Sequence, residues 1–222
     1  MRDDPKGTGP RPPDAGLAVK RIIRDAALRL PEFAHVDASR VLVILGEARR
    51  ASRASVRPLH FSDSGSRKSA SGARIRPLVR IRGRNIRYIL TLRPLFFLES
   101  SPENRISTVI HEIFHFSEDF DGTLHPGRRH SVLGNDFDRQ LSPLIARYLD
   151  SAPEVVWRNM AVDGDVRVRM WREKPGLTAV RIEPDGRRIV SGRQVYTEEQ
   201  TFFSTFRMKT KKKHRRALGI GD

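Results

Sequence analysis

The apolar residues of this chain occur only in short runs, and the longest of them span 41–45 and 95–98. A helix that crosses a bilayer needs about 20 consecutive apolar residues, so the sequence predicts no contact with a membrane. In some segments the apolar residues recur at the three- and four-residue spacing of amphipathic helices. Other segments have the β-branched composition of strands. In a chain of 222 residues, this pattern predicts an α+β protein with one sizeable core and a smaller appendage.

Three segments have the apolar spacing of helices. Asp14 is a suitable N-cap for a helix that ends before Pro31. Ser100 and Glu103 have the spacing of a capping box, which predicts that a second helix begins there. The predicted core face of this second helix consists of Ile106, Val109, Ile110, Ile113 and Phe114. A third periodic stretch covers 137–149, and the proline within it is expected to start or kink the helix.

Other segments have the composition of strands. Residues 40–47 form a β-branched run that is typical of a buried strand. Residues 78–82 and 86–92 predict two strands that are joined as a hairpin by the short connection between them. The polar segment 49–72 predicts an excursion off the sheet with little core of its own.

We expect four parts along the chain. Residues 1–13 are rich in proline and glycine and predict a disordered arm. A main domain follows at 14–150, with the order helix, mixed sheet, helix and closing helix. Short strand-like runs predict a small β-rich appendage at 151–206. Residues 207–222 form a basic tail that is too polar to build a core.

The chain contains no cysteine. This excludes a disulfide framework, a thiol nucleophile and any zinc site built on cysteine, so a metal must be held by imidazole and carboxylate groups. The first residues contain acids, prolines and glycines where a secretory signal would have a continuous apolar segment. We therefore expect a cytoplasmic protein.

Basic residues are in large excess. The 42 Lys and Arg residues outnumber the 26 Asp and Glu residues, which gives a formal charge of +16. This charge predicts affinity for polyanions, and the basic tail and the arginines between 74 and 87 offer a surface for nucleic acid. The alternative is a solvated basic surface without a partner.

Residues 111–115 read His-Glu-Ile-Phe-His, an HExxH motif on the second predicted helix. Histidines four residues apart lie on one helix face, so His111 and His115 can bind one metal ion while Glu112 projects beside them. Zinc held by neutral imidazoles lowers the pKa of its bound water to about 7. Glu112 can then take the proton as the water attacks a carbonyl, and pass it to the leaving amine.

A catalytic zinc site of this type needs a third protein ligand, for which three candidates follow the motif. His130 is our first choice, because the glycines and proline before it can return the chain to the metal. His125 is the second choice. Asp121 has the metzincin spacing, but Glu118 stands where that pattern has its glycine. Tyr88 and the arginines at 128 and 129 are candidates for stabilising the transition state.

The segment 110–130, IHEIFHFSEDFDGTLHPGRRH, resembles the zincin site of SprT-like proteins and, more closely, that of the phage-type metallopeptidase family. The resemblance covers roughly residues 15–150 and implies a zincin-like fold. It also implies that His111, His115 and His130 are zinc ligands and that Glu112 is the catalytic base.

The sequence departs from the SprT-like pattern in two places. That pattern has an aromatic residue a few positions after the third histidine, and Phe137 is farther away. SprT-like proteins also commonly end in a four-cysteine zinc ribbon, which this cysteine-free chain cannot form, so their role in DNA repair is not implied here.

The sequence thus predicts a zinc-dependent metallopeptidase that hydrolyses peptide bonds of a peptide or protein substrate. The alternative is a nucleic-acid-binding protein with a structural or vestigial zinc site, or a SprT-like protease that acts on DNA-bound proteins.

Overall fold

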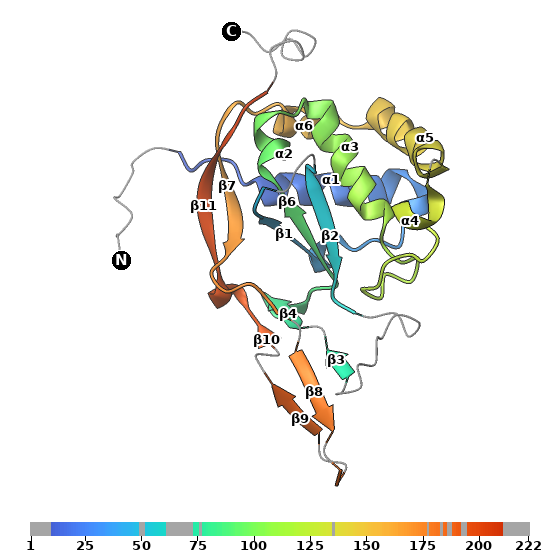
Figure 1. Cartoon of the computed structure of the whole chain (residues 1–222). Coiled ribbons are helices and arrows are strands. Elements are labelled where there is room, and N and C mark those ends of the chain that lie inside the picture. Colours follow the sequence, from blue (N-terminus) through green and yellow to red (C-terminus); the bar gives the residue numbers. More distant parts are fainter. Residues whose placement is uncertain are drawn as a thin grey trace.

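The computed structural model describes residues 10–48, 52–60, 73–75, 77–134, 136–176, 178–182, 184–185, 188–191 and 195–210. These residues form an α+β fold, as the sequence predicts (Figure 1). No helix within these ranges has the length and apolar character that a membrane span requires. Most of the predicted arm at 1–13, most of the basic tail at 207–222 and the greater part of the segment 49–72 lie outside the described residues.

The elements follow one another along the chain as Figure 1 labels them. The helices are α1 (Ala15–Arg29), α2 (Pro94–Leu98), α3 (Pro102–Phe114), α4 (His130–Leu133), α5 (Asp136–Ser151) and α6 (Glu154–Met160). The first six strands are β1 (Val41–Leu45), β2 (Ala54–Pro58), β3 (Ala73–Ile75), β4 (Leu78–Ile81), β5 (Arg84–Asn85) and β6 (Tyr88–Leu92). The others are β7 (Gly164–Trp171), β8 (Thr178–Ile182), β9 (Arg188–Ser191), β10 (Val195–Tyr196) and β11 (Thr201–Met208).

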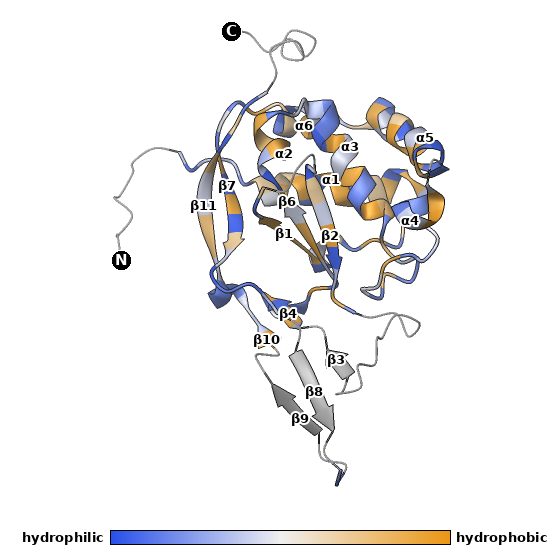
Figure 2. Ribbon diagram, in the orientation of Figure 1, coloured by the Kyte–Doolittle hydropathy of each residue, from blue (hydrophilic) through white to orange (hydrophobic). Residues whose placement is uncertain are grey.

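A mixed three-stranded sheet in the order β1-β6-β2 lies at the centre. β6 runs parallel to β1 and antiparallel to β2. Every residue of β1 is buried, because alternate side chains enter two apolar clusters on opposite faces of the sheet. This two-sided burial explains the continuous apolar run in the sequence. Figure 2 shows the apolar residues along these strands and on the helices beside them.

The prediction that 78–82 and 86–92 form a hairpin is wrong, because the second of these strands pairs elsewhere. β4 pairs antiparallel with the two-residue strand β5, through a tight turn in which Arg82 and Gly83 both have positive φ. The chain then leaves this hairpin, and β6 enters the central sheet instead. The burial of Tyr88, Leu90 and Leu92 against the helices accounts for this placement.

The prediction that 49–72 is an excursion off the sheet is also wrong for its described part. β2 is an edge strand of the central sheet, with Ala54 opposite Leu92 and Val56 opposite Leu90. An edge strand needs only one apolar face, so the polar residues of 52–58 do not prevent pairing.

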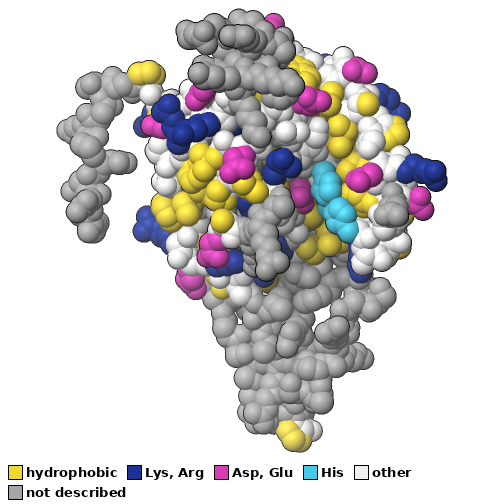
Figure 3. Space-filling model, turned by 45° about the horizontal axis from the view of Figure 1, so that its top comes forward, with side chains coloured by type: hydrophobic (Ala, Val, Ile, Leu, Met, Phe, Trp, Pro, Cys, Tyr) yellow, Lys and Arg dark blue, Asp and Glu magenta, His cyan; other side chains and the backbone are white. Residues whose placement is uncertain are grey.

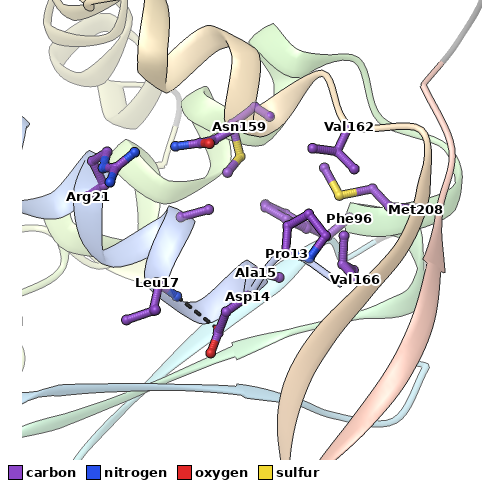
Figure 4. Close-up of a pocket in the computed structure, with 12 residues that line it drawn as sticks. Pro13, Asp14, Ala15, Leu17, Arg21, Phe96, Asn159, Val162, Val166 and Met208 are labelled. Atoms are coloured by element: carbon purple, nitrogen blue, oxygen red, sulfur yellow. Dashed lines mark hydrogen bonds between the residues drawn. The ribbon is translucent and has the colours of Figure 1, made fainter. Parts of the chain in front are cut away.

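Helix α1 begins where the sequence predicts, since the Asp14 carboxylate accepts a hydrogen bond of 3.1 Å from the Leu17 backbone N–H (Figure 4). The start of α1 borders a small groove of about 190 Å³ that Phe96, Val166 and Met208 also line (Figure 4).

Helix α3 begins one residue later than predicted. Ser101, not Ser100, is the N-cap, and its hydroxyl accepts a hydrogen bond of 3.0 Å from the Asn104 N–H. The Ser100 hydroxyl donates instead to the Leu95 carbonyl at 2.8 Å, which ties it to α2. Both serines are buried and both precede the helix, so the spacing of residues in the sequence alone could not show which of them is the N-cap.

The segment 151–206, which the sequence predicts to be a small β-rich appendage, begins with helix α6, and its strands lie in different structural environments. β7 and β11 form a long antiparallel pair, and Val166, Val168 and Met208 belong to the same apolar cluster as α1 and α3. β8 and β9 lie in a separate three-stranded sheet with β3. The first pair therefore contributes to the core of the main domain.

Arg105 of α3 is fully buried and connects four elements. Its guanidinium donates to the carbonyl groups of Phe96, Phe97, Met160 and Lys209 and to the Thr210 hydroxyl. Burial lowers the pKa of Arg105 to about 10, so the side chain is charged at neutral pH. These bonds join α3 to the ends of α2, α6 and β11.

We expect Arg105→Met to reduce the free energy of unfolding by about 3–5 kcal/mol, because several buried carbonyl groups lose their donor. Arg147→Met is the control, since Arg147 is about half exposed and pairs with Glu32 on the surface. It should cost less than about 1 kcal/mol. Urea denaturation of both variants tests this, and equal losses would contradict the role of Arg105.

Candidate metal centre

Helix α3 positions the residues of the HExxH motif. Its apolar face packs against the core, with Ile106, Val109, Ile110, Ile113 and Phe114 all buried as predicted. His111 and Glu112 lie in the last turn of the helix, and His115 is the residue that caps its end. Glu112 is only 6% exposed and His115 9%. The helix therefore holds the three side chains on a rigid base.

His130 joins the two histidines of the motif. It is the first residue of α4, and its Nε2 lies 3.1 Å from Nε2 of His111. The centroids of the three imidazole rings are 5.0 to 5.2 Å apart. One nitrogen from each ring lies within 4.8 Å of the other two, so the three histidines are close enough to hold a metal ion. Histidine side chains gather at one place on the surface in Figure 3.

Phe137 lies against all three histidine rings. Its ring centroid is 4.0 Å from that of His130, 5.0 Å from that of His111 and 5.3 Å from that of His115. Phe137 is buried at the start of α5. Phe137 follows His130 at a greater distance in the sequence than the expected pattern has. The short helix α4 nevertheless returns the chain, so that the Phe137 ring lies against the three imidazoles.

A backbone hydrogen bond orients His115. Its Nδ1 donates to the Arg128 carbonyl at 2.7 Å, which leaves Nε2 available to a metal. Such a bond from the second ring nitrogen fixes the tautomer and orientation of a ligand histidine. The Arg128 carbonyl is therefore a functional group that no side-chain motif in the sequence could have indicated.

Tyr88 anchors the loop between the motif and His130. Its hydroxyl donates to the Thr123 carbonyl at 2.7 Å and accepts from the backbone N–H groups of Ser117 and Gly122. Its ring stacks on Phe116 at 3.9 Å. Burial raises the pKa of Tyr88 to about 12. Tyr88 thus has a structural role here and does not line the cleft beside the histidines.

The alternative third ligands have other partners. Nδ1 of His125 accepts from the Gly127 N–H, and its Nε2 lies 3.4 Å from a Glu118 carboxylate oxygen. Asp121 accepts hydrogen bonds from the backbone and hydroxyl of Thr123. Among the described residues, the cluster of possible metal ligands contains neither of them.

The two arginines that precede His130 differ in their surroundings. Arg128 forms an ion pair of 2.8 Å with Glu118 and lies over the Phe114 ring. Arg129 lines the cleft beside the histidines. Of the sequence candidates for stabilising a transition state, Arg129 is therefore the one that faces the cleft.

Burial determines the charge of the site. It lowers the pKa of His111 to about 4, with further lowering from the charges of His115 and His130. The pKa of His115 is also lowered, mainly by burial. Burial raises the pKa of Glu112 to about 7, although the Val56 backbone N–H and the Arg93 charge oppose this rise. His111 and His115 are thus neutral at neutral pH, as metal ligands must be.

A cleft of about 340 Å³ opens over the histidines. It lies between the motif and strand β2, and its lining includes Glu112, Arg129 and residues 54–56. A second cavity of about 370 Å³ shares Ser52, Ala54, His111 and Glu112 with it and extends toward α5. Sequence reasoning missed β2 as part of the site, because its residues carry no chemical motif.

No family model, no curated protein and no solved structure matches this chain. The description of the site therefore rests on its geometry, which brings His111, His115 and His130 together beside Glu112.

We expect His130→Ala to lower the affinity for a divalent metal by more than about 100-fold, since it removes a direct ligand rather than an outer-shell group. His125→Ala should leave the metal affinity within a few-fold of the original. Competition with a chromogenic chelator measures both constants. The opposite order of affinities would transfer the ligand role to His125.

Proposed function

We propose that this protein is a zinc-dependent metallopeptidase with a zincin-like active site, in which His111, His115 and His130 hold the ion and Glu112 is the catalytic base. The observation that carries the proposal is the convergence of three imidazoles and one buried carboxylate on one cleft. The proposed substrate is a peptide or protein.

The donor set fits zinc. Two imidazole nitrogens on one tetrahedral ion, each at 2.0–2.1 Å, are about 3.3 Å apart, and the Nε2 atoms of His111 and His130 are 3.1 Å apart. Zinc supplies Lewis acidity, which acidifies water and polarises a carbonyl oxygen. Histidine binds a metal as a neutral ligand, so a site of three histidines leaves the charge of the ion uncompensated and preserves that acidity.

Glu112 can move the proton that hydrolysis requires. Its carboxylate lines the cleft beside His111 and His115, so it can receive a proton from an attacking water and deliver it to the leaving amine nitrogen. Arg129 lines the same cleft and can stabilise negative charge on the carbonyl oxygen.

Strand β2 offers a way to hold an extended peptide over these groups. Within the described part of the chain, β2 pairs only with β6, and its other edge borders the cleft. A peptide that adds to this edge would be positioned by backbone hydrogen bonds, largely independently of its side chains.

Glu112→Gln should keep the metal and lower the rate of peptide hydrolysis by about 100- to 10,000-fold, because glutamine cannot accept the proton. Glu103→Gln, an exposed position on the same helix, is the control and should retain activity. Metal content by elemental analysis and cleavage of a denatured protein substrate are measured together. Unchanged cleavage by Glu112→Gln would refute the mechanism.

A second candidate function, nucleic-acid binding, is favoured by the outer face of β7 and β11. Phe203 is 40% exposed there, and the guanidinium carbons of Arg167 and Arg169 lie 4.4 and 4.6 Å from its ring centroid. Burial and the charges of Arg169 and Arg82 lower the pKa of Lys20, and Arg167 also lies 3.7 Å from an Asp14 carboxylate oxygen. An exposed aromatic ring among cations suits single-stranded nucleic acid.

If this face binds nucleic acid, the logarithm of the affinity for a single-stranded oligonucleotide should fall linearly with the logarithm of salt concentration. Arg169→Gln should weaken binding and reduce the slope by about one. Arg139→Gln, on the exposed surface of α5, is the charge-matched control. Equal binding by the two variants in fluorescence anisotropy would exclude this face.

A further inference from the structure

A larger cavity, of about 750 Å³, lies on the face of the central sheet that is turned away from α3. It spans the three strands of the sheet and is closed on the other side by the end of β7 and by Phe206 of β11. Ser55 and Val56 line both this cavity and the cleft over the histidines. The two spaces therefore meet at the edge strand β2.

The cavity is basic. Its lining contains Arg57, Arg93, Arg172 and Lys174 but only one acidic residue, Glu47. Arg57 is half-buried, and its one hydrogen bond in the described structure runs from Nη1 to the Pro175 carbonyl at 2.8 Å. No carboxylate of the described residues forms an ion pair with it. A half-buried cation that has no carboxylate partner among these residues favours an anionic ligand.

The alternation of β2 connects this charge to the cleft. Ala54 and Val56 pair with Leu92 and Leu90 and face the helices. Ser55 and Arg57 pair with the intervening residues of β6, so they face the opposite side, where the cavity lies. A strand that pairs with β2 must alternate in the same way, with every second side chain on the face of Arg57.

We propose that the substrate is an extended polypeptide with acidic side chains at alternate positions, which enter the basic cavity while the intervening side chains face the histidines. The proposal rests on the proposed peptidase function. Directly opposed side chains on neighbouring strands lie about 5 Å apart, so a glutamate opposite Arg57 or Ser55 is within reach of the guanidinium. The basic charge of the cavity and the alternation of side chains along β2 thus together define the substrate class as an acidic, extended polypeptide.

The position of the cavity favours a peptide over a nucleic acid. Its lining includes residues 55–57 of the edge strand β2, where backbone N–H and C=O groups are spaced for another strand. The remaining lining is largely apolar, with Ile44, Leu45, Met170 and Trp171, and suits the hydrocarbon part of a side chain. A nucleic acid is the other outcome that the experiment distinguishes.

The experiment uses two fluorogenic peptides of identical composition, in which glutamates at alternate positions are shifted by one residue relative to a fixed cleavable bond. The zinc-loaded protein should cleave one register about five- to tenfold faster in kcat/KM than the other. Arg57→Gln should remove this preference. Arg139→Gln, which removes the same charge from an exposed side chain of α5 that does not line the cavity, should retain it.

Binding of both peptides to the Glu112→Gln variant, measured by anisotropy, separates this proposal from the peptidase function. Preferential binding of one register without cleavage by the unmodified protein would support the basic cavity and refute peptidase activity. Equal cleavage and equal binding of both registers would overturn the acidic preference. An oligonucleotide that binds with dependence on Arg57, while the register preference is absent, would assign the cavity to nucleic acid.

Discussion

The buried guanidinium of Arg105 fixes the helix on which the candidate site is built. A charged group is tolerated in the core only when buried polar groups, here mainly carbonyl oxygens, satisfy its N–H groups. Those carbonyls belong to α2, to the end of α6 and to the residue after β11, and carbonyls at chain ends need donors from outside their own element. The arginine thus finds acceptors for its N–H groups, and the carbonyls of these chain ends find a donor. Together these bonds hold α3 in one orientation.

The site itself depends on a second constraint, the path of the loop between α3 and α4. Three loop backbone groups bond to the Tyr88 hydroxyl of the central sheet. The same loop supplies the Arg128 carbonyl that orients His115 and delivers His130 to the other two imidazoles. The sheet therefore positions the third histidine indirectly, through backbone hydrogen bonds, and Phe137 supports the three rings from the side of α5.

The sequence predicted α1, α3 and α5, because each has an apolar face with its own periodicity. It missed α2, α4 and α6, which have five, four and seven residues and are too short to show such a period. It also predicted which histidines meet, since the HExxH spacing is local and His130 follows a loop with turn residues. It failed for β2 and for the partner of β6, because strand pairing depends on distant residues such as Leu90 and Val56. The roles of Tyr88 and of the Arg128 carbonyl were hidden for the same reason.

Among the described residues β2 pairs on one side only, and this has a consequence for self-association. An unpaired strand edge can also pair with the same edge of a second molecule and so begin aggregation. In such an antiparallel dimer around Val56, both Arg57 side chains would lie on one face of the joined sheet, where like charges repel. Pro58 lacks the N–H group that longer pairing would need. The strand can thus accept an acidic guest while it disfavours a copy of itself.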